Sequence, residues 1–391
     1  MRFQAITIFI LLLSSLAQAQ NDGPKKFTFR GYLKNMSSLN YVADQYWYEN
    51  LTHNRLNFAW YPKESVSAYV EFRNRLFLGD FVNEFPNYGE LINSNNDFFN
   101  LSTNVIDNQS AILNVMVDRA FLQWNKNDWE VKLGRQRINW GVNLAWNPND
   151  WFNAYSFFDF DYEERPGSDA LRISKYTGAA SSIEVAAKIA EDVDRFVGAA
   201  MWRINASNYD MQFLAGVAQG DLALGTGWAG NLGNAGFKGE LTYFTPVVDT
   251  RVNEDYNQML LGAVSIDYSF ASSLYLNGSV MYNSKAELDP EFGFAFTGVR
   301  LGNFTVRDIS QYRWSSFIQS TYQFSPLIFG GMAVIAYPGS NAFFLNPMVT
   351  FSLRQNFDLD LVGQIFFDEK PLSGDYGAVS EAAFARLKWS F

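Results

Sequence analysis

The feature that most restricts the fold of this chain is a two-residue rhythm of apolar and polar side chains. Eighteen segments of about ten residues show this rhythm, from Phe27–Lys34 to Glu381–Phe391. In the last of them, Leu387 and Trp389 alternate with Arg386. Because successive side chains of a β-strand point to opposite faces, each segment predicts a strand that is apolar on one face and polar on the other.

The connections between these segments alternate in length. Short ones such as Asn125–Asp128 have the composition of tight turns, whereas Gly79–Asn114, Ile138–Asp169 and Ser284–Gln311 are long. Short periplasmic turns alternating with long external loops are typical of outer-membrane barrels. We therefore predict an all-β fold: a transmembrane, antiparallel, up-and-down β-barrel of about 18 strands, within a range of about 16–18, with an external loop inserted in its lumen.

The composition agrees with strands that are apolar on one side only. Aromatic residues make up 17% of the chain, which aromatic girdles at the two membrane interfaces would explain. The mean hydropathy is nevertheless −0.14. A transmembrane helix needs about 20 apolar residues, and after the first segment the sequence contains no such run. The sequence therefore predicts no transmembrane helices.

The first nineteen residues have the pattern of a secretory signal. Arg2 is followed by an apolar stretch, Ile6–Leu13, and by the small-x-small pattern Ala17-Gln18-Ala19. We expect residues 1–19 to be a signal peptide and residues 20–391 to form a single outer-membrane β-barrel. The aromatic end at Phe391 resembles the signal that barrel-assembly machinery recognises. The expected location is the bacterial cell outer membrane, with membrane lipids and the assembly machinery as partners.

Several classes of function are disfavoured by residue counts. The chain has no cysteine and one histidine, His53, which argues against disulfides, thiolate chemistry and a His-rich metal site. A net charge of −10 disfavours nucleic acid as a partner. A barrel enzyme would need a histidine base beside a nucleophile or an acid, and His53 has no such motif around it. We expect no enzyme activity and no cofactor.

The strand phase places a set of basic side chains on the inner face of the first six predicted strands. In Val66–Leu76, for example, the apolar set faces lipid and the charged set faces the lumen. The predicted basic wall comprises Arg30, Arg55, Arg73, Arg75, Arg119, Lys132 and Arg172. Two interpretations are open. These cations form a track that draws anions through a pore, or they pair with lumen acids such as Glu71 and Glu130.

The connection 138–169 is too aromatic for a loop exposed to water, so we expect it to fold into the barrel mouth. Its acids would then oppose the basic wall across a constriction. The predicted constriction residues are Asp159, Asp161, Glu163, Glu164 and Arg165, and the predicted loop anchors are Arg135, Arg137 and Trp140. Arg135, Arg137 and Arg165 could instead pair with those acids. A Ca²⁺ site from the acids is a weaker alternative, because their spacing matches no known calcium loop.

The same region carries a family resemblance. Its motifs are Gly134-Arg135-Gln136, Trp140-Gly141, Asn147-Pro148-x-Asp150 and Arg165-Pro166-Gly167-x-Asp169-Ala170-Leu171. They resemble a family of large outer-membrane barrels of Gram-negative bacteria and, more distantly, alginate-export and substrate-specific porins of eighteen strands. The start of the mature chain and its aromatic content look Bacteroidota-like. The resemblance implies diffusion or export of a hydrophilic ligand through a barrel that this loop constricts.

The functional hypothesis from the sequence is an outer-membrane channel for passive passage of small hydrophilic, anionic solutes through a lumen constricted by loop 138–169. One alternative is a plugged barrel that acts as a scaffold or binding component of an outer-membrane complex, with the long loop Gly79–Asn114 meeting the partner. Another is a channel for hydrophobic compounds, since apolar side chains can line substrate sites. The sequence does not reveal the oligomeric state.

Overall fold

The computed structural model describes residues 26–42, 45–93, 97–155, 157, 161, 167–191, 195–247, 258–290, 304–369 and 374–391. The predicted signal peptide lies outside the described residues. So do four of the five predicted constriction residues, namely Asp159, Glu163, Glu164 and Arg165.

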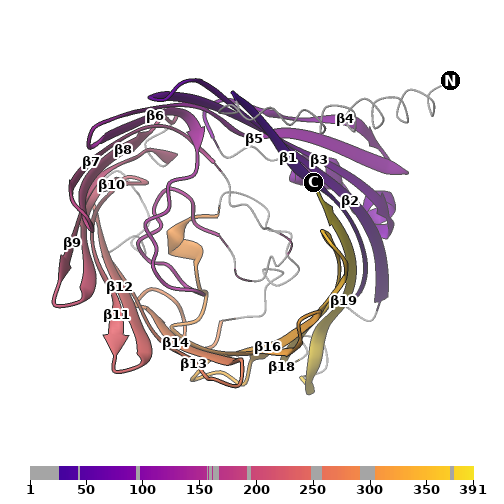
Figure 1. The fold of residues 1–391 in the computed structure, drawn as a ribbon. Coiled ribbons are helices and arrows are strands. Elements are labelled where there is room, and N and C mark those ends of the chain that lie inside the picture. The colour runs from indigo at the N-terminus through magenta and orange to yellow at the C-terminus, as the bar shows by residue number, and fades with distance from the viewer. Residues whose placement is uncertain are drawn as a thin grey trace.

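The described chain is almost entirely antiparallel β-strand (Figure 1). The strands are β1 (Phe27–Val42), β2 (Gln45–Lys63), β3 (Val66–Gly79), β4 (Ser102–Asn108), β5 (Ala111–Lys126), β6 (Trp129–Gln136), β7 (Ser168–Gly178), β8 (Ser181–Lys188), β9 (Val197–Ala206), β10 (Tyr209–Ala218), β11 (Asp221–Leu232), β12 (Ala235–Pro246), β13 (Met259–Ser269), β14 (Leu274–Asn283), β15 (Trp314–Ser325), β16 (Ile328–Ala336), β17 (Phe343–Arg354), β18 (Phe357–Glu369) and β19 (Tyr376–Ser390). Three short helices accompany them: α2 (Asp80–Glu84), α3 (Tyr88–Ile92) and η4 (Val306–Asp308).

Each strand of the barrel wall pairs with the wall strands before and after it in the sequence, and the ring closes where β1 pairs with β19. All strands except β4 belong to this ring, which gives eighteen wall strands in the part of the chain that the structure describes. The prediction of an all-β, up-and-down barrel of 16–18 strands is therefore confirmed. No helix among these residues is long and apolar enough to cross a membrane.

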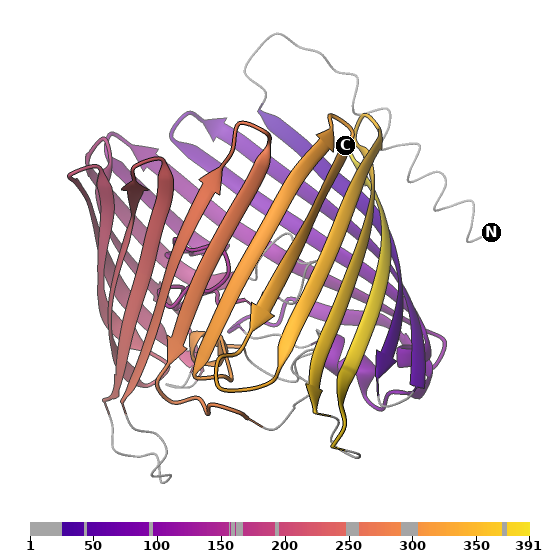
Figure 2. The same ribbon diagram turned by 90° about the horizontal axis from the view of Figure 1, so that it is seen from below.

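The tight turns gather at one end of the barrel, together with the C-terminus (Figure 2). At this end β9 and β10 are joined by Ser207 and Asn208, whose φ angles of 53° and 65° are both positive. A two-residue turn with positive φ at both positions matches the right-handed twist of a hairpin. Most connections at the other end are long. The link between β10 and β11 is an exception, because Gln219 and Gly220 form a two-residue turn there.

Strand β4 was not predicted. One edge of β5 pairs with β3. On its other edge, residues 111–116 pair with β4 and residues 120–126 pair with β6. β4 therefore continues the line of β6, and the connection between β3 and β5 contains ordered structure. The helices α2 and α3 pack in the same region through Val82 and Tyr88, which contact the inward-facing Met36, Leu51 and Phe77.

Burial alternates along the wall strands as a barrel requires. On β2, for example, Leu51, His53 and Arg55 are buried, whereas Phe58 and Trp60 are 42% and 46% exposed. The exposed apolar set is the lipid-facing surface of such a barrel, and the buried set faces the lumen.

The main hydrophobic core lies inside the barrel. It joins Trp140, Trp146, Trp151 and Phe152 of the connection between β6 and β7 to inward-facing side chains of the wall from β7 to β18. The prediction that this external connection inserts into the lumen is confirmed (Figure 1). The lumen therefore has one side filled by an apolar loop and another side, formed by β1–β3, β5–β7, β18 and β19, that carries most of the charged side chains.

Candidate functional site in the barrel lumen

The inserted loop is fixed to the wall by one buried carboxylate. Glu240, on β12, is 1% exposed and accepts three backbone N–H groups of the loop. The donors are Val142 at 2.6 Å, Asn143 at 2.9 Å and Asn149 at 2.8 Å. Backbone groups withdrawn from water need such acceptors, so the single carboxylate replaces the hydrogen bonds that the loop would otherwise make with water.

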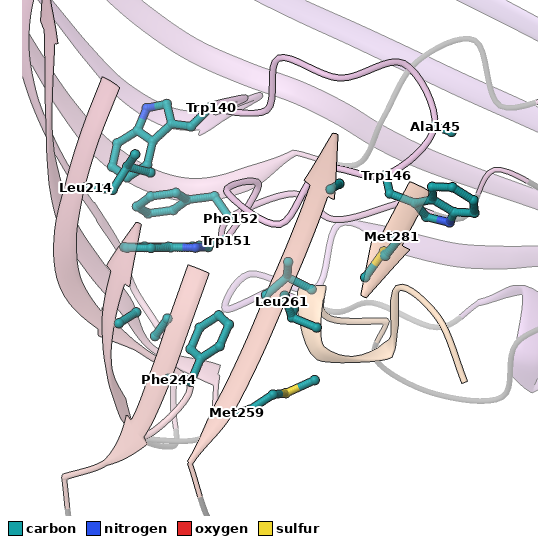
Figure 3. Close-up of a cluster of buried hydrophobic side chains, with 14 of the residues drawn as sticks. Trp140, Ala145, Trp146, Trp151, Phe152, Leu214, Phe244, Met259, Leu261 and Met281 are labelled. Atoms are coloured by element: carbon teal, nitrogen blue, oxygen red, sulfur yellow. The ribbon is translucent and has the colours of Figure 1, made fainter. Parts of the chain in front are cut away.

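Aromatic packing holds the same loop on both sides of this anchor (Figure 3). Trp140 lies edge-on to Phe152 with ring centroids 4.9 Å apart, and Trp151 contacts Phe244 of β12 at 6.2 Å. The indole N–H of Trp140 donates to Glu184 of β8. Trp140 is thus buried between loop and wall, the position that a loop anchor needs.

The two predicted arginine anchors contact residues close to the two ends of the loop. Arg135 forms a two-pronged ion pair with Asp169, through Nε at 2.9 Å and Nη2 at 2.7 Å, and also donates to the carbonyl of Phe99. Arg137 donates to the side chain of Asn139. The register of β6 and β7 places Asp169 directly opposite Arg135. Pairing of Arg135 and Arg137 with Asp159, Glu163 or Glu164 stays a prediction, because those acids lie outside the described residues.

At its far end the loop reaches the opposite, charged wall. Asp161 accepts hydrogen bonds at 2.8 Å from Lys34 of β1 and at 2.8 Å from Arg386 of β19. His53 of β2 lies 3.5 Å from the second carboxylate oxygen. Burial of Asp161 favours its neutral form, but the bonds and charges of His53 and Lys34 outweigh burial and hold the pKa of that carboxyl well below its usual range. The loop thus contacts two walls of the lumen.

Next to this contact lies an arginine cluster, defined as Arg55, Arg73, Arg75 and Arg119 with the carboxylates Asp118 and Glu71. The carboxylate of Asp118 forms ion pairs with Arg55 at 2.5 Å and with Arg73 at 2.8 Å, and Arg55 also pairs with Glu71. Arg119 donates to the backbone carbonyl of Asp118. Arg75 donates to the side chain of Asn114 and to the carbonyl of Ile92. Two of the four arginines, Arg55 and Arg73, thus pair directly with the cluster carboxylates, and the other two donate to neutral groups beside them.

The remaining predicted wall cations lie nearer the short-turn end. Lys132 and Arg172 both contact Glu130, at 3.3 Å and 3.4 Å, and Arg172 also contacts Glu184 at 2.9 Å. Arg30 is exposed and lies close to the end of β1. The predicted basic wall is thus interleaved with acids, as the second of the two interpretations anticipated for Arg55, Lys132 and Arg172.

Three important residues were missed by the sequence interpretation. Asp118 shares the alternation phase of the outward-facing Ala120 and Leu122, but a bulge opposite Glu71 turns it inward beside Arg119. A charge in the lipid-facing phase was the available signal for such a bulge. The alternation of the last segment places Arg386 on its polar face. Its place beside the predicted basic wall depends on the pairing of the last strand with the first, which the pattern of one segment does not indicate. Glu240 had no distinguishing local pattern.

A second external connection also enters the barrel. The helix η4 places Arg307 in an ion pair with the fully buried Asp221 of β11 and over the ring of Phe244. Val306 of the same helix belongs to the inner core. Within the described ranges no group of three or more His, Cys, Asp or Glu side chains could hold a metal ion.

The fold and the inserted loop together are those of a large, porin-like β-barrel. Among solved structures, the chain is similar to Acinetobacter baumannii OccAB4, with a TM-score of 0.59, 8% identity and coverage of 94% of this chain and 98% of that one. It is similar to Pseudomonas aeruginosa OccK11 (OpdR), with a TM-score of 0.57, 9% identity and coverage of 93% and 96%. It is also similar to Pseudomonas aeruginosa OpdK, solved with vanillate, with a TM-score of 0.57, 10% identity and coverage of 93% and 98%.

At these identities the likeness establishes the fold. No protein-family model matches the chain, and no curated protein matches it in sequence. The resemblances to alginate-export porins and to Bacteroidota proteins therefore stay predictions.

Proposed function

We propose that this protein is an outer-membrane channel through which small hydrophilic solutes pass passively, with a preference for anions. The observation that carries the proposal is the arginine cluster on the lumen wall, where Arg55 and Arg73 pair with Asp118, Arg55 also pairs with Glu71, and Arg75 and Arg119 lie beside them. Guanidinium groups fixed on the wall of a narrow, low-dielectric passage attract anions and repel cations.

The proposed constriction is the connection 138–169. Its support is the geometry of its two attachments, Glu240 on one wall and Lys34 with Arg386 on the other. A loop held at both sides narrows the passage and directs solutes along the charged wall. The apolar side chains of the lumen are packed against this loop. They consequently present little surface to a solute, which disfavours a channel for hydrophobic compounds.

Location and partners follow from the same proposal. The exposed apolar side chains of the outward face would contact outer-membrane lipids, and Phe391, whose backbone exchanges two hydrogen bonds of 2.9 Å with Gly31, would be read by the barrel-assembly machinery before this seam closes. The proposal includes no cofactor, nucleic acid or catalytic step.

Planar-bilayer recording tests the proposal. In a tenfold salt gradient, an ideally anion-selective pore gives a reversal potential of about 59 mV, and partial selectivity gives a fraction of it. We expect an anion-selective sign for the wild type and a potential shifted toward zero for Arg73→Gln, Arg75→Gln and Arg119→Gln combined. Vanillate and uncharged sugars of similar size would then be compared in liposome uptake.

The control removes the same charge elsewhere. Lys63→Gln, Lys126→Gln and Lys175→Gln act at the short turns outside the lumen, so the reversal potential should stay close to that of the wild type. Heat-modifiable migration in gels checks that each variant forms a barrel. A potential unchanged by the lumen variant would refute anion preference, and absence of any conductance would favour the plugged, scaffold alternative.

A further inference from the structure

The outward face of β1, β2 and β3 carries a polar patch where a barrel normally presents apolar side chains to lipid. We call it the asparagine patch, and it consists of Asn35, Ser37, Asn50, Thr52, Asn54 and Asn74. Its members are hydrogen-bonded to one another. Asn35 and Asn50 donate to each other at 3.0 Å and 3.2 Å, Asn35 also donates to Thr52, and Asn74 donates to Asn54. The patch is uncharged and spans three adjacent strands.

The depth of the patch places it within the membrane. Trp60, at the short-turn end of β2, is 46% exposed and belongs to the aromatic rim. Asn54 lies six residues further along the same outward set, and Thr52 lies eight. With a rise of about 3.3 Å per residue and a strand tilt of about 35–45°, these side chains lie about 15 Å and about 20 Å from the level of Trp60. The apolar band of such a barrel is about 25 Å tall, so both fall inside it.

Other parts of the wall keep an apolar surface at mid-strand. On β13, β14 and β15 the outward-facing Val264, Val280 and Ile318 are 43%, 47% and 64% exposed. Hydrocarbon chains can solvate these side chains but cannot hydrogen-bond to amides and hydroxyls. Hydrocarbon is therefore a poorer cover for this patch than a surface that offers polar groups.

A groove adjoins the patch on one side. It has a volume of about 670 Å³ and runs over β17, β18, β19 and the end of β1. Its floor is made of small outward-facing residues, among them Pro347, Gly363, Ala383 and Ala385. Gly363 and Pro347 are close enough that a Cβ on the glycine would lie 3.0 Å from the proline ring. On the other side of the patch, β3 presents the apolar Leu76 and Leu78 outward.

We infer that this face binds a second copy of the same chain, with the two barrels related by a two-fold axis along the membrane normal. Asn side chains donate and accept, so a patch of asparagines is complementary to its own copy. A two-fold axis through the patch sets the left side of one copy against the right side of the other. The groove of one barrel then faces the apolar side chains of β3 in its partner.

The absence of cysteine allows a direct test. Thr52→Cys introduces one thiol in the patch, and Ile318→Cys introduces one on the outward face of β15 as a matched control. Membranes that contain each variant are treated with a short bis-maleimide. We expect a product of twice the 44.5 kDa chain mass, less any cleaved signal, for Thr52→Cys only. Monomer alone, equal coupling of both variants, or coupling to a different protein would each overturn the inference.

A second variant tests the chemistry of the interface. Asn35→Leu, Asn50→Leu and Asn54→Leu together make the face compatible with lipid, so we expect the dimer to be lost while each barrel keeps its heat-modifiable migration and its conductance. Dimers of undiminished amount in a nanodisc mass measurement would contradict the proposed role of the patch. If this triple variant does not assemble, the coupling experiment with Thr52→Cys decides alone. Neither result depends on the ion preference proposed above.

Discussion

Removal of the Glu240 carboxylate is predicted to release the inserted loop. In Glu240→Ala the N–H groups of Val142, Asn143 and Asn149 lose their common acceptor. An unsatisfied buried donor costs about 1–3 kcal/mol, so three donors cost about 3 kcal/mol at the least if no water replaces the acceptor. Since about 1.4 kcal/mol is a factor of ten, the ratio of detached to docked loop rises by about 150-fold or more.

Two assays report the release. Single-channel recording should show a larger or noisier conductance, because the loop no longer narrows the lumen. Trypsin added to intact cells should cut after Arg137, which lies between the end of β6 and the docked loop 138–169 and is half-buried in the wild type. Glu240→Gln keeps one acceptor oxygen and should give an intermediate effect.

The control is Asp267→Ala on the neighbouring strand β13. Asp267 pairs at 3.4 Å with a partly exposed Lys238, and such a pair contributes about 0–1 kcal/mol. This variant should retain the wild-type conductance and cleavage rate. If Glu240→Ala behaves like Asp267→Ala in both assays, the carboxylate does not hold the loop and the reasoning fails.

Three further predictions concern the loop end, the wall and the seam. Asp161→Asn should increase anion preference in reversal-potential measurements, because it removes one negative charge beside Lys34 and Arg386, while Arg386 keeps its ion pair with Asp360. Since the pKa of Asp161 is lowered, its negative charge persists throughout the usual carboxyl range and is lost only as the pH falls through the lowered value. A difference in selectivity between the wild type and Asp161→Asn that disappeared between pH 7 and pH 5 would contradict this. Asn346→Ala removes the donor that reaches the carbonyl of Gly363 at 2.7 Å beside Pro347, so denaturant unfolding in detergent should show a loss of about 1–3 kcal/mol, and no loss would refute the role. Phe391→Ala removes ring contacts with Phe29 and Trp389 at the seam, so the yield of folded barrel in membranes should drop, whereas Phe324→Ala, an exposed control on β15, should leave it unchanged.

The strands could be predicted from the sequence because lipid imposes a physical rule at every second position. A polar side chain that faces lipid costs free energy, so each wall strand shows the alternation within its own short segment of sequence. The aromatic content of 138–169 likewise indicated that this loop leaves water. In contrast, β4 contains only seven residues and lies in a long connection, where no lipid enforces alternation.

The pairing of charges could not be predicted in the same way. Asp118 becomes the partner of Arg55 and Arg73 only because a bulge adds one residue to β5. Arg386 joins Lys34 at Asp161 because the ring closes between the two ends of the chain. Both contacts depend on register and closure, which are properties of several strands together.

The packing of the inserted loop on one side of the lumen affects which amino-acid substitutions this protein tolerates. The apolar inward positions of β9–β17 resemble the interior of a water-soluble protein, since Met201, Leu214, Phe244 and Phe317 are each 3% exposed or less. A deep mutational scan should therefore find polar replacements rejected there and accepted at many inward positions of β6 and β7. The two sides of one barrel lumen would thus show opposite substitution profiles.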